Sequence, residues 1–378
     1  MTTSHPAPTH VPSASPREAI DPFAWTKIGE MPYPGGELLK GWFSAGYLAL
    51  GWVEQNGDLA PVASFSRDGR TWRSADLTTP VTPCPGWTAR PDGSVADGWA
   101  AGGGAVFVGM ETVLHGETCD QTRPVAWISS DGLDWTRTHA FEPAGLPITY
   151  PTAVWTTPSG WETALKETDD RTWLWQSADA ATWERRGMIS ANPDLGLIVV
   201  ANDGTRVVVA SDDAGRSRLL STSTDGRTWR AIAGPPVVST GPGDDWQVIR
   251  VLAPDGPAPF WTVVASGEEG PDAHATIWTS ADLETWQSGR FPMPSISALG
   301  VTSDGILALG TDPCSITGSA CPPTRPPRWF RSLDGLTWLP LASTRGPDTL
   351  MEGPAGTIGI GAPSGNGRPA PVYRLERR

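Results

Sequence analysis

Apolar residues follow one another along this chain in short alternating runs. Two examples are Arg206-Val-Val-Val-Ala210 and Phe260-Trp-Thr-Val-Val-Ala265, and Gly, Pro and Asp bound such runs. Alternation over about four to eight residues between turn-forming residues is typical of β-strands. The pattern therefore predicts an all-β chain with many tight turns.

A seven-residue motif recurs six times between these runs, with Ser first, Asp third and Trp seventh. Asp and Ser side chains can hydrogen-bond the backbone of a turn, and Trp offers a large apolar face for packing. Gly occupies the fourth position in four copies, where it permits a positive φ. The other two copies carry Ala180 and Leu283 there, so their turns must avoid a positive φ or tolerate strain. The copies of this Ser–Asp–Trp motif span residues 66–72, 129–135, 177–183, 223–229, 280–286 and 332–338.

The motif recurs at the period of a propeller blade, because its tryptophans lie 46 to 63 residues apart. A blade has four antiparallel strands, A innermost to D outermost, and we place the motif at the turn from C to D. We expect its aspartates to be structural: Asp68, Asp131, Asp179, Asp225, Asp282 and Asp334. Short turns upstream are expected to join strands A and B, at residues 44–46, 102–104, 158–160, 202–204, 254–256, 303–305 and 354–356.

The two ends of the chain explain why there are seven such turns and six motifs. Residues 371–375 resemble a strand C without its motif, and residues 25–28 resemble a strand D without the motif before it. Joined, they predict a seven-bladed β-propeller closed by both ends, with a six-bladed ring and a stray end as the alternative. Residues 1–22 are expected to be a disordered leader rich in Pro, Ser and Thr, followed by one propeller domain over residues 23–378.

The motif resembles the Asp-box, or BNR repeat, of β-propellers in the sialidase-like superfamily, and the resemblance covers residues 23–378. It implies the fold alone, because in that family the box lies away from the active site. The copies here are one residue shorter than the usual sialidase box. A sialidase needs an arginine triad, a Tyr–Glu nucleophile pair and an Arg-Ile-Pro motif. This chain has no Arg-Ile-Pro sequence and four tyrosines, so we expect no sialidase activity.

The charge balance narrows the classes of ligand. The net charge is −13, whereas nucleic acids and anionic membranes attract basic surfaces. We expect a neutral or cationic ligand, no nucleic acid, no membrane span, no cofactor, no metal and a monomer. The N-terminal residues lack the charged start and apolar core of a secretory signal. We expect an extracytoplasmic or secreted protein whose signal was removed, with a cytoplasmic location as the alternative.

Long connections and cysteines point to one face of the ring. The connections from D to A and from B to C open on the face opposite the A–B turns and the motifs, and we call this the loop face. Four cysteines fall in long connections there, and we expect disulfides Cys84–Cys119 and Cys314–Cys321, with four reduced thiols as the alternative. The long connections are residues 76–95, 110–124, 234–245, 266–275 and 311–328.

Candidate site residues lie on the inner strands near the mouths of the channel. The ligand-binding candidates are Lys40, Trp99, Tyr150, Trp155, Trp246 and Arg250. The acids for a two-carboxylate hydrolase are Asp97, Asp244, Asp245 and Glu352. Mutual pairing of charges and packing of tryptophans between blades are the structural alternatives. The sequence thus supports a propeller that binds a glycan or protein at its loop face, with a carbohydrate-active or small-molecule enzyme as the alternative.

Overall fold

The computed structural model describes residues 20–32, 35–43, 45–55, 58–77, 97–101, 104–115, 118–138, 141, 148–157, 159–167, 172–189, 196–202, 207–212, 217–225, 228–232, 247–254, 258–266, 275–312, 326–343, 346–362 and 368–378. These residues form strands and turns and contain no helix, which confirms the all-β prediction.

The strands pair into seven antiparallel sheets of four strands each. Six sheets consist of strands that follow one another in the chain. The first three contain β2 (Gly35–Phe43), β3 (Gly46–Gln55), β4 (Asp58–Ser66) and β5 (Arg73–Asp76); β6 (Asp97–Ala101), β7 (Gly104–His115), β8 (Thr118–Ser129) and β9 (Thr136–Thr138); β10 (Ile148–Thr157), β11 (Gly160–Glu167), β12 (Thr172–Ser177) and β13 (Glu184–Met188). The next three contain β14 (Gly196–Asn202), β15 (Val207–Asp212), β16 (Ser217–Ser223) and β17 (Arg230–Ile232); β18 (Gln247–Leu252), β19 (Trp261–Ser266), β20 (Ala275–Ser280) and β21 (Gln287–Arg290); β22 (Ser295–Thr302), β23 (Gly305–Thr311), β24 (Arg328–Ser332) and β25 (Leu339–Pro340).

The remaining sheet joins both ends of the chain, and we call it the composite sheet. It contains β26 (Thr349–Met351), β27 (Ile358–Ile360), β28 (Ala370–Arg377) and β1 (Phe23–Met31). β1 is its outermost strand and pairs with β28, with Trp25 opposite Leu375 and Lys27 opposite Tyr373. The predicted pairing of the two chain ends is therefore confirmed.

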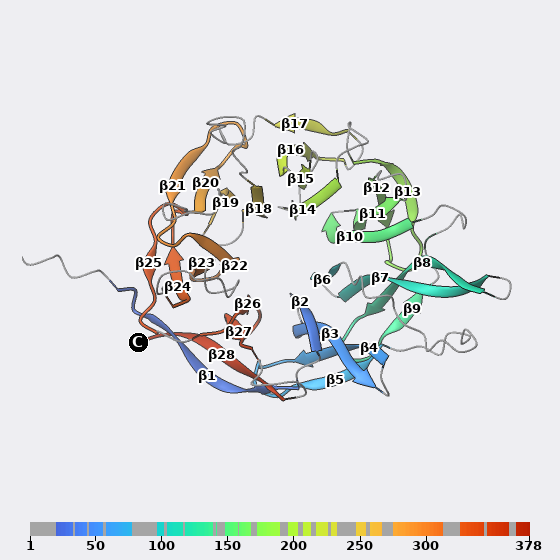
Figure 1. Ribbon diagram of the computed structural model, residues 1–378, viewed down its shortest axis with the longest axis horizontal. Coiled ribbons are helices and arrows are strands. Elements are labelled where there is room, and N and C mark those ends of the chain that lie inside the picture. Colours follow the sequence, from blue (N-terminus) through green and yellow to red (C-terminus); the bar gives the residue numbers. More distant parts are fainter. Residues whose placement is uncertain are drawn as a thin grey trace, which may run out of the picture.

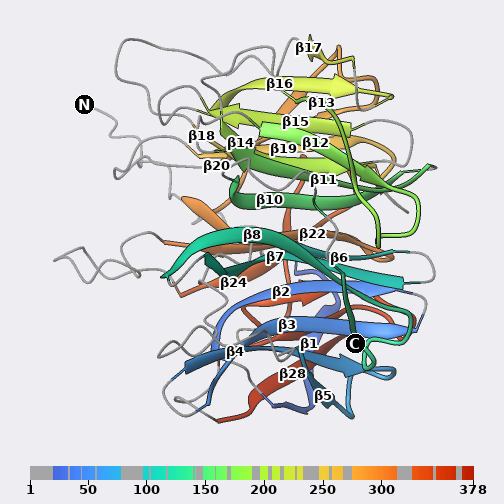
Figure 2. The same ribbon diagram turned by 90° about the vertical axis from the view of Figure 1, so that its right-hand side faces the viewer.

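The sheets stand around a ring with one edge strand of each toward the centre (Figure 1). The inner strands contact one another in the order β2, β6, β10, β14, β18, β22 and β26, and β26 contacts β2. Seen from the side, the strands run between two faces of the ring (Figure 2). The molecule is a β-propeller.

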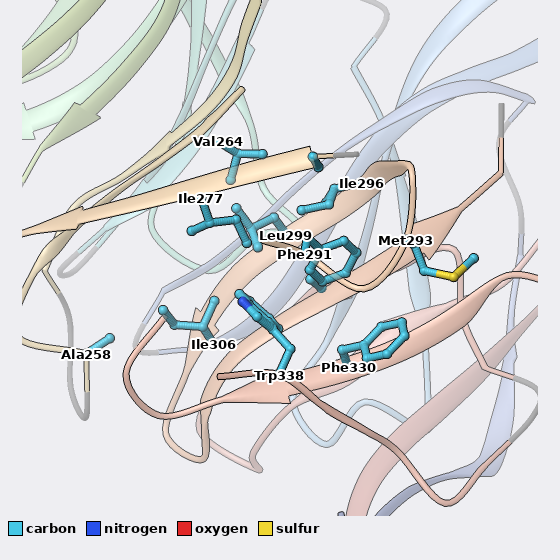
Figure 3. Packing of buried hydrophobic residues seen from close by; sticks show 12 residues of the cluster. Ala258, Val264, Ile277, Phe291, Met293, Ile296, Leu299, Ile306, Phe330 and Trp338 are labelled. Atoms are coloured by element: carbon cyan, nitrogen blue, oxygen red, sulfur yellow. The ribbon is translucent and has the colours of Figure 1, made fainter. Parts of the chain in front are cut away.

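The hydrophobic core is divided among the junctions between neighbouring sheets. Each of the seven clusters of buried residues joins two sheets. In the cluster between β18–β21 and β22–β25, Ile277 comes from one sheet and Ile306 and Phe330 from the other, with Phe291 between them (Figure 3). Six clusters include a motif tryptophan, as the packing argument predicted. The seventh cluster lies between β22–β25 and the composite sheet and contains Trp25 and Trp329 instead.

An ion pair closes that seventh junction. Arg331 Nε lies 2.8 Å from Asp21 Oδ2, and the two side chains are 15% and 1% exposed. Arg331 also donates to the carbonyl of Asp304, and its guanidinium stacks 4.7 Å from the ring centre of Phe23. Asp21 forms a parallel bridge with Leu341. Asp21 and Pro22, which we had assigned to the leader, therefore belong to the folded ring.

The predicted long loop over residues 110–124 is wrong. β7 and β8 instead continue as one hairpin, with Met110 opposite Pro124 and Val113 opposite Gln121, and residues 116–117 connect the strands. This hairpin extends outward from the ring (Figure 1). Cys119 and His115 accordingly lie in strands and not in a loop. The sequence of this segment does not alternate apolar and polar residues as the core strands do, which is why the sequence predicts a loop there.

Candidate functional site

The Ser–Asp–Trp turns are built by their own side chains, as predicted. In the second copy Asp131 Oδ1 accepts hydrogen bonds from the backbone N–H groups of Leu133 and Asp134, both at 2.8 Å. The hydroxyl of Ser129 donates to the same oxygen at 3.2 Å. In the fifth copy the equivalent bonds, first from Thr285 N–H and then from Glu284 N–H, lower the pKa of Asp282 to about 2. These carboxylates are occupied by the turn, which leaves them little capacity for a ligand.

In the five copies whose fourth residue the structure describes, that residue adopts a positive φ whether it is Gly, Ala or Leu. Gly132 has φ 78°, while Ala180 and Leu283 have 59° and 67°. These two turns therefore tolerate the strain, and both side chains are buried at 2% exposure. Leu283 packs with Ile232 of the preceding sheet and Trp261 of its own. Burial at the junction offsets the backbone cost, which is about 1–2 kcal/mol for an L-residue.

The inner strands place two candidates, Asp97 and Tyr150, toward the loop face. Each inner strand begins after a D–A connection and ends at an A–B turn, so its first residues lie at the loop face. Asp97 is the first residue of β6 and Tyr150 the third of ten in β10, whereas Arg250 is the fourth of six in β18 and lies in the middle of that strand. β6 and β10 are neighbours in the ring, which brings Asp97 and Tyr150 to one side of the mouth. Trp99 lies in the middle of β6, and Lys40 lies nearer the turn end of β2.

Irregular pairing marks the same end of the inner strands. The register shifts between Ile148 and Tyr150, between Leu197 and Val199, between Val248 and Arg250, and between Ile296 and Ala298. β2 has a larger shift, between Gly35 and Leu39. Such bulges re-aim side chains and are over-represented beside functional sites. In β22 the skipped residue, Ser297, is exposed although its neighbours are buried.

Glu352 does not join Asp97, because it follows the end of β26 and lies at the turn face. Its Oε1 accepts from Ser303 Oγ at 3.0 Å and its Oε2 from Thr357 Oγ1 at 2.5 Å. Burial raises the pKa of this carboxyl, and these hydrogen bonds oppose the rise. Glu352 ties together the A–B turns of two neighbouring sheets. A structural role fits it better than membership of a catalytic pair at the loop face.

Trp155 is a core residue, because it is 3% exposed and packs with Leu174 and Ile189. Its indole N–H donates to Glu162 Oε2 at 2.8 Å. Glu162 is itself 3% exposed, and burial raises the pKa of its carboxyl. No sequence pattern indicates this buried acid, since Glu162 stands alone in an otherwise ordinary strand.

Several predicted residues fall outside the described part of the chain. Trp246, Asp244 and Asp245 are among them, as are Cys84, Cys314 and Cys321. The side chain of Cys119 is likewise not described, and no disulfide occurs among the residues that the structure describes. Within the same residues no group of three or more His, Cys, Asp or Glu side chains could hold a metal ion. No helix in the described residues is long and apolar enough to cross a membrane.

Comparison with known proteins supports the assignment of the fold and identifies no functional residue. No family model and no curated protein matches the sequence. The solved structure described as YCF48 bound to D1 peptide matches with a TM-score of 0.53 and 11% identity, over 96% of this chain and 100% of that one. At this identity the likeness shows a shared β-propeller fold.

Two further solved structures are less similar in shape. A mutant of Trypanosoma rangeli sialidase with trans-sialidase activity matches 94% of this chain with a TM-score of 0.45 and 11% identity. This chain spans 59% of that sialidase. Sucrose-6-phosphate hydrolase from Lactobacillus gasseri matches 93% of each chain with a TM-score of 0.38 and 9% identity.

Proposed function

We propose that this protein is a non-catalytic binding propeller that holds a segment of a partner protein at the loop face of its channel. The observation that carries the proposal is the irregular start of the inner strands, where bulges adjoin Tyr150 and Arg250. Asp97 begins a neighbouring inner strand at the same end. An acid, a phenol and a guanidinium are groups that orient a polypeptide by hydrogen bonds and charge.

A protein segment is the ligand class that we favour. YCF48, which matches over nearly the full length of both chains, is described as bound to a peptide. The net charge of −13 favours a neutral or cationic segment. A two-acid hydrolase is less well supported, because Glu352 is engaged at the turn face and lies away from Asp97.

Arrays of immobilised peptides and of glycans test the proposal together. The variant Asp97→Ala with Asp245→Ala alters the loop face, and Arg70→Ala with Arg227→Ala is the matched change on the turn face. We expect peptide binding by the wild type that falls about tenfold in the first variant and stays unchanged in the second. Binding that only the second variant loses would move the site to the turn face. Glycans bound in place of peptides, or sugar released from them, would replace the proposal with the carbohydrate alternative.

We further propose an extracytoplasmic location with disulfides Cys84–Cys119 and Cys314–Cys321. The support is the even number of cysteines and their spacing in the sequence. Mass spectrometry of protein purified under oxidising conditions should find both cross-linked peptide pairs. Four thiols that alkylate freely in the same sample would contradict the pairing and favour the cytoplasmic alternative.

A further inference from the structure

We propose that the junction between the β22–β25 sheet and the composite sheet is a second docking surface, on the turn face. It takes a segment of a partner protein that carries an apolar side chain beside a carboxylate. We call this surface the closure seam and define it by Ile20, Arg331, Leu333, Leu339 and Arg377. It is independent of the loop-face site proposed above.

At the other junctions a Ser–Asp–Trp turn covers the edge of the neighbouring sheet, and the closure seam has no such turn. A Ser–Asp–Trp turn packs on the sheet before its own: a Cβ at Gly335 would lie 2.5 Å from Thr279 Cγ2, and one at Gly69 would lie 3.1 Å from Ile358 Cγ2. Among the described sheets, the composite sheet alone has no such turn, because β28 and β1 come from opposite ends of the chain. Arg331 in β24 is equivalent to Thr279 in β20 of the preceding sheet, because each residue immediately precedes its motif serine.

Trp25, a buried tryptophan at the seam, occupies a motif position without the motif turn before it. Arg73 follows the motif residue Trp72 and pairs with strand C, and Thr26 follows Trp25 and pairs with strand C in the same way. Trp25 therefore occupies the position of a motif tryptophan. In Trp72 the indole N–H donates to the carbonyl of Gly69 at 3.2 Å, and three other copies repeat this bond at 3.1 Å. Trp25 is 5% exposed, and its indole nitrogen has no hydrogen-bond partner in the described structure, as is also the case for the motif residue Trp229.

Apolar side chains remain uncovered around this gap. Ile20, Leu333 and Leu339 are 56%, 59% and 36% exposed, and they are the exposed large hydrophobic residues of the described chain. All three adjoin the ion pair: Leu339 lies opposite Arg331, Leu333 follows it by two residues, and Ile20 precedes Asp21. The first motif carries Arg67 and Arg73 at the positions of Leu333 and Leu339. Leucine is therefore not required by the turn itself, and clustered apolar exposure marks an interaction site.

Arg377 supplies a positive charge at the seam. Arg377 is exposed and lies opposite Phe23, whose ring faces Arg331 across the junction. It has no ion-pair partner among the described residues, whereas Arg331 is paired with Asp21. The nearby Asp334 is engaged, since its Oδ1 accepts from the N–H groups of Leu336 and Thr337. An incoming carboxylate would find Arg377 available, which is why we assign an acidic residue to the partner segment.

Selection from a phage-displayed library of random peptides on the full-length chain tests the closure seam. We expect an enriched group that combines an aliphatic or aromatic residue with Asp or Glu. Synthetic copies should bind about tenfold more weakly to Leu333→Ser with Leu339→Ser, and also to Arg377→Glu. The matched variant Arg67→Ser with Arg73→Ser should bind as the wild type does. Equal melting temperatures of all variants would show that the ring is intact.

Three results would overturn the proposal. One is that no enriched peptide distinguishes the leucine variant from the wild type, or that the enriched peptides lack acidic residues. Another is self-association in analytical ultracentrifugation that the leucine variant abolishes, because the occupant is then a second copy of the chain. The third is peptide binding that appears only after deletion of residues 1–19, because these residues would then be the occupant. The loop-face variant Asp97→Ala with Asp245→Ala separates this site from the first, since seam-binding peptides should not respond to it.

Discussion

Replacing Asp21 by Ala should weaken the ring at its closure. The substitution leaves Arg331, 15% exposed, without its carboxylate partner, and it removes the 2.9 Å bond from Phe23 N–H to Asp21 Oδ1. Breaking a buried ion pair costs about 3–5 kcal/mol, and the lower end applies because Arg331 keeps the Asp304 carbonyl. The lost backbone bond adds about 1 kcal/mol. With an unfolding entropy of about 2.1 cal/mol/K per residue, a total of about 4 kcal/mol lowers the melting temperature by about 5 °C.

Differential scanning calorimetry measures this shift, and a nearby exposed pair supplies the control. Lys27 Nζ lies 2.7 Å from Glu30 Oε1 in the same strand, but the two side chains are 52% and 54% exposed. Glu30→Ala should leave the melting temperature unchanged within error, because exposed pairs contribute little. A double-mutant cycle that combines Asp21→Ala with Arg331→Met then measures the coupling energy between these two side chains. If Asp21→Ala has the same melting temperature as the wild type, or if the cycle gives no coupling energy, the stability of the ring closure does not depend on this ion pair.

Two truncations extend the same test to the whole closing strand. Deletion of residues 1–20 retains Asp21 and should leave the melting temperature unchanged. Deletion of residues 1–30 removes most of β1, including Trp25, which is 5% exposed in the core. Loss of a buried tryptophan alone costs about 3–5 kcal/mol, so the longer deletion should melt many degrees lower or fail to fold. An unchanged melting point for it would mean that the composite sheet does not act as a seventh blade.

Four other predictions concern single side chains. Gly132→Ala should cost about 1–2 kcal/mol in denaturant unfolding because of its positive φ. Ala180→Gly should change stability by less than about 0.5 kcal/mol, since relief of strain is offset by loss of a buried methyl group. The raised pKa of Glu162 means that the wild type loses stability as pH rises from about 4.3 toward that pKa, so Glu162→Gln should melt higher near pH 8 and approach the wild type near pH 4. Asp131→Ala should cost about 1–3 kcal/mol in unfolding without weakening peptide binding.

The repeat made the architecture readable from the sequence. A motif that fixes its own turn through Asp and Ser needs no distant partner, so its position reveals the C–D connection wherever it occurs. The pairing of Trp25 with Leu375 followed from the same logic, because one motif was missing and both ends carried strand patterns. Local chemistry thus specified strands, turns and closure.

Other features depend on contacts that the sequence does not display. The sequence of the β7–β8 hairpin predicts a loop because residues 110–124 lack the alternation of the core strands. The role of Asp21 depends on Arg331, 310 residues away. Glu352 was grouped with Asp97 from its place at a strand end. Which end of the ring a strand terminus occupies follows from strand direction, and the partners Ser303 and Thr357 become visible only in the folded chain.

The composite sheet has a consequence for biosynthesis. Of the strands of the ring, the ribosome makes β1 first, and its partner β28 follows roughly 350 residues and some 20–70 s later at usual elongation rates. During that interval Trp25 and Met31, both buried in the finished ring, have no β28 to pair with. A nascent chain therefore exposes an apolar strand until β28 has been made, and a chaperone that shields residues 23–31 would act before the ring can close.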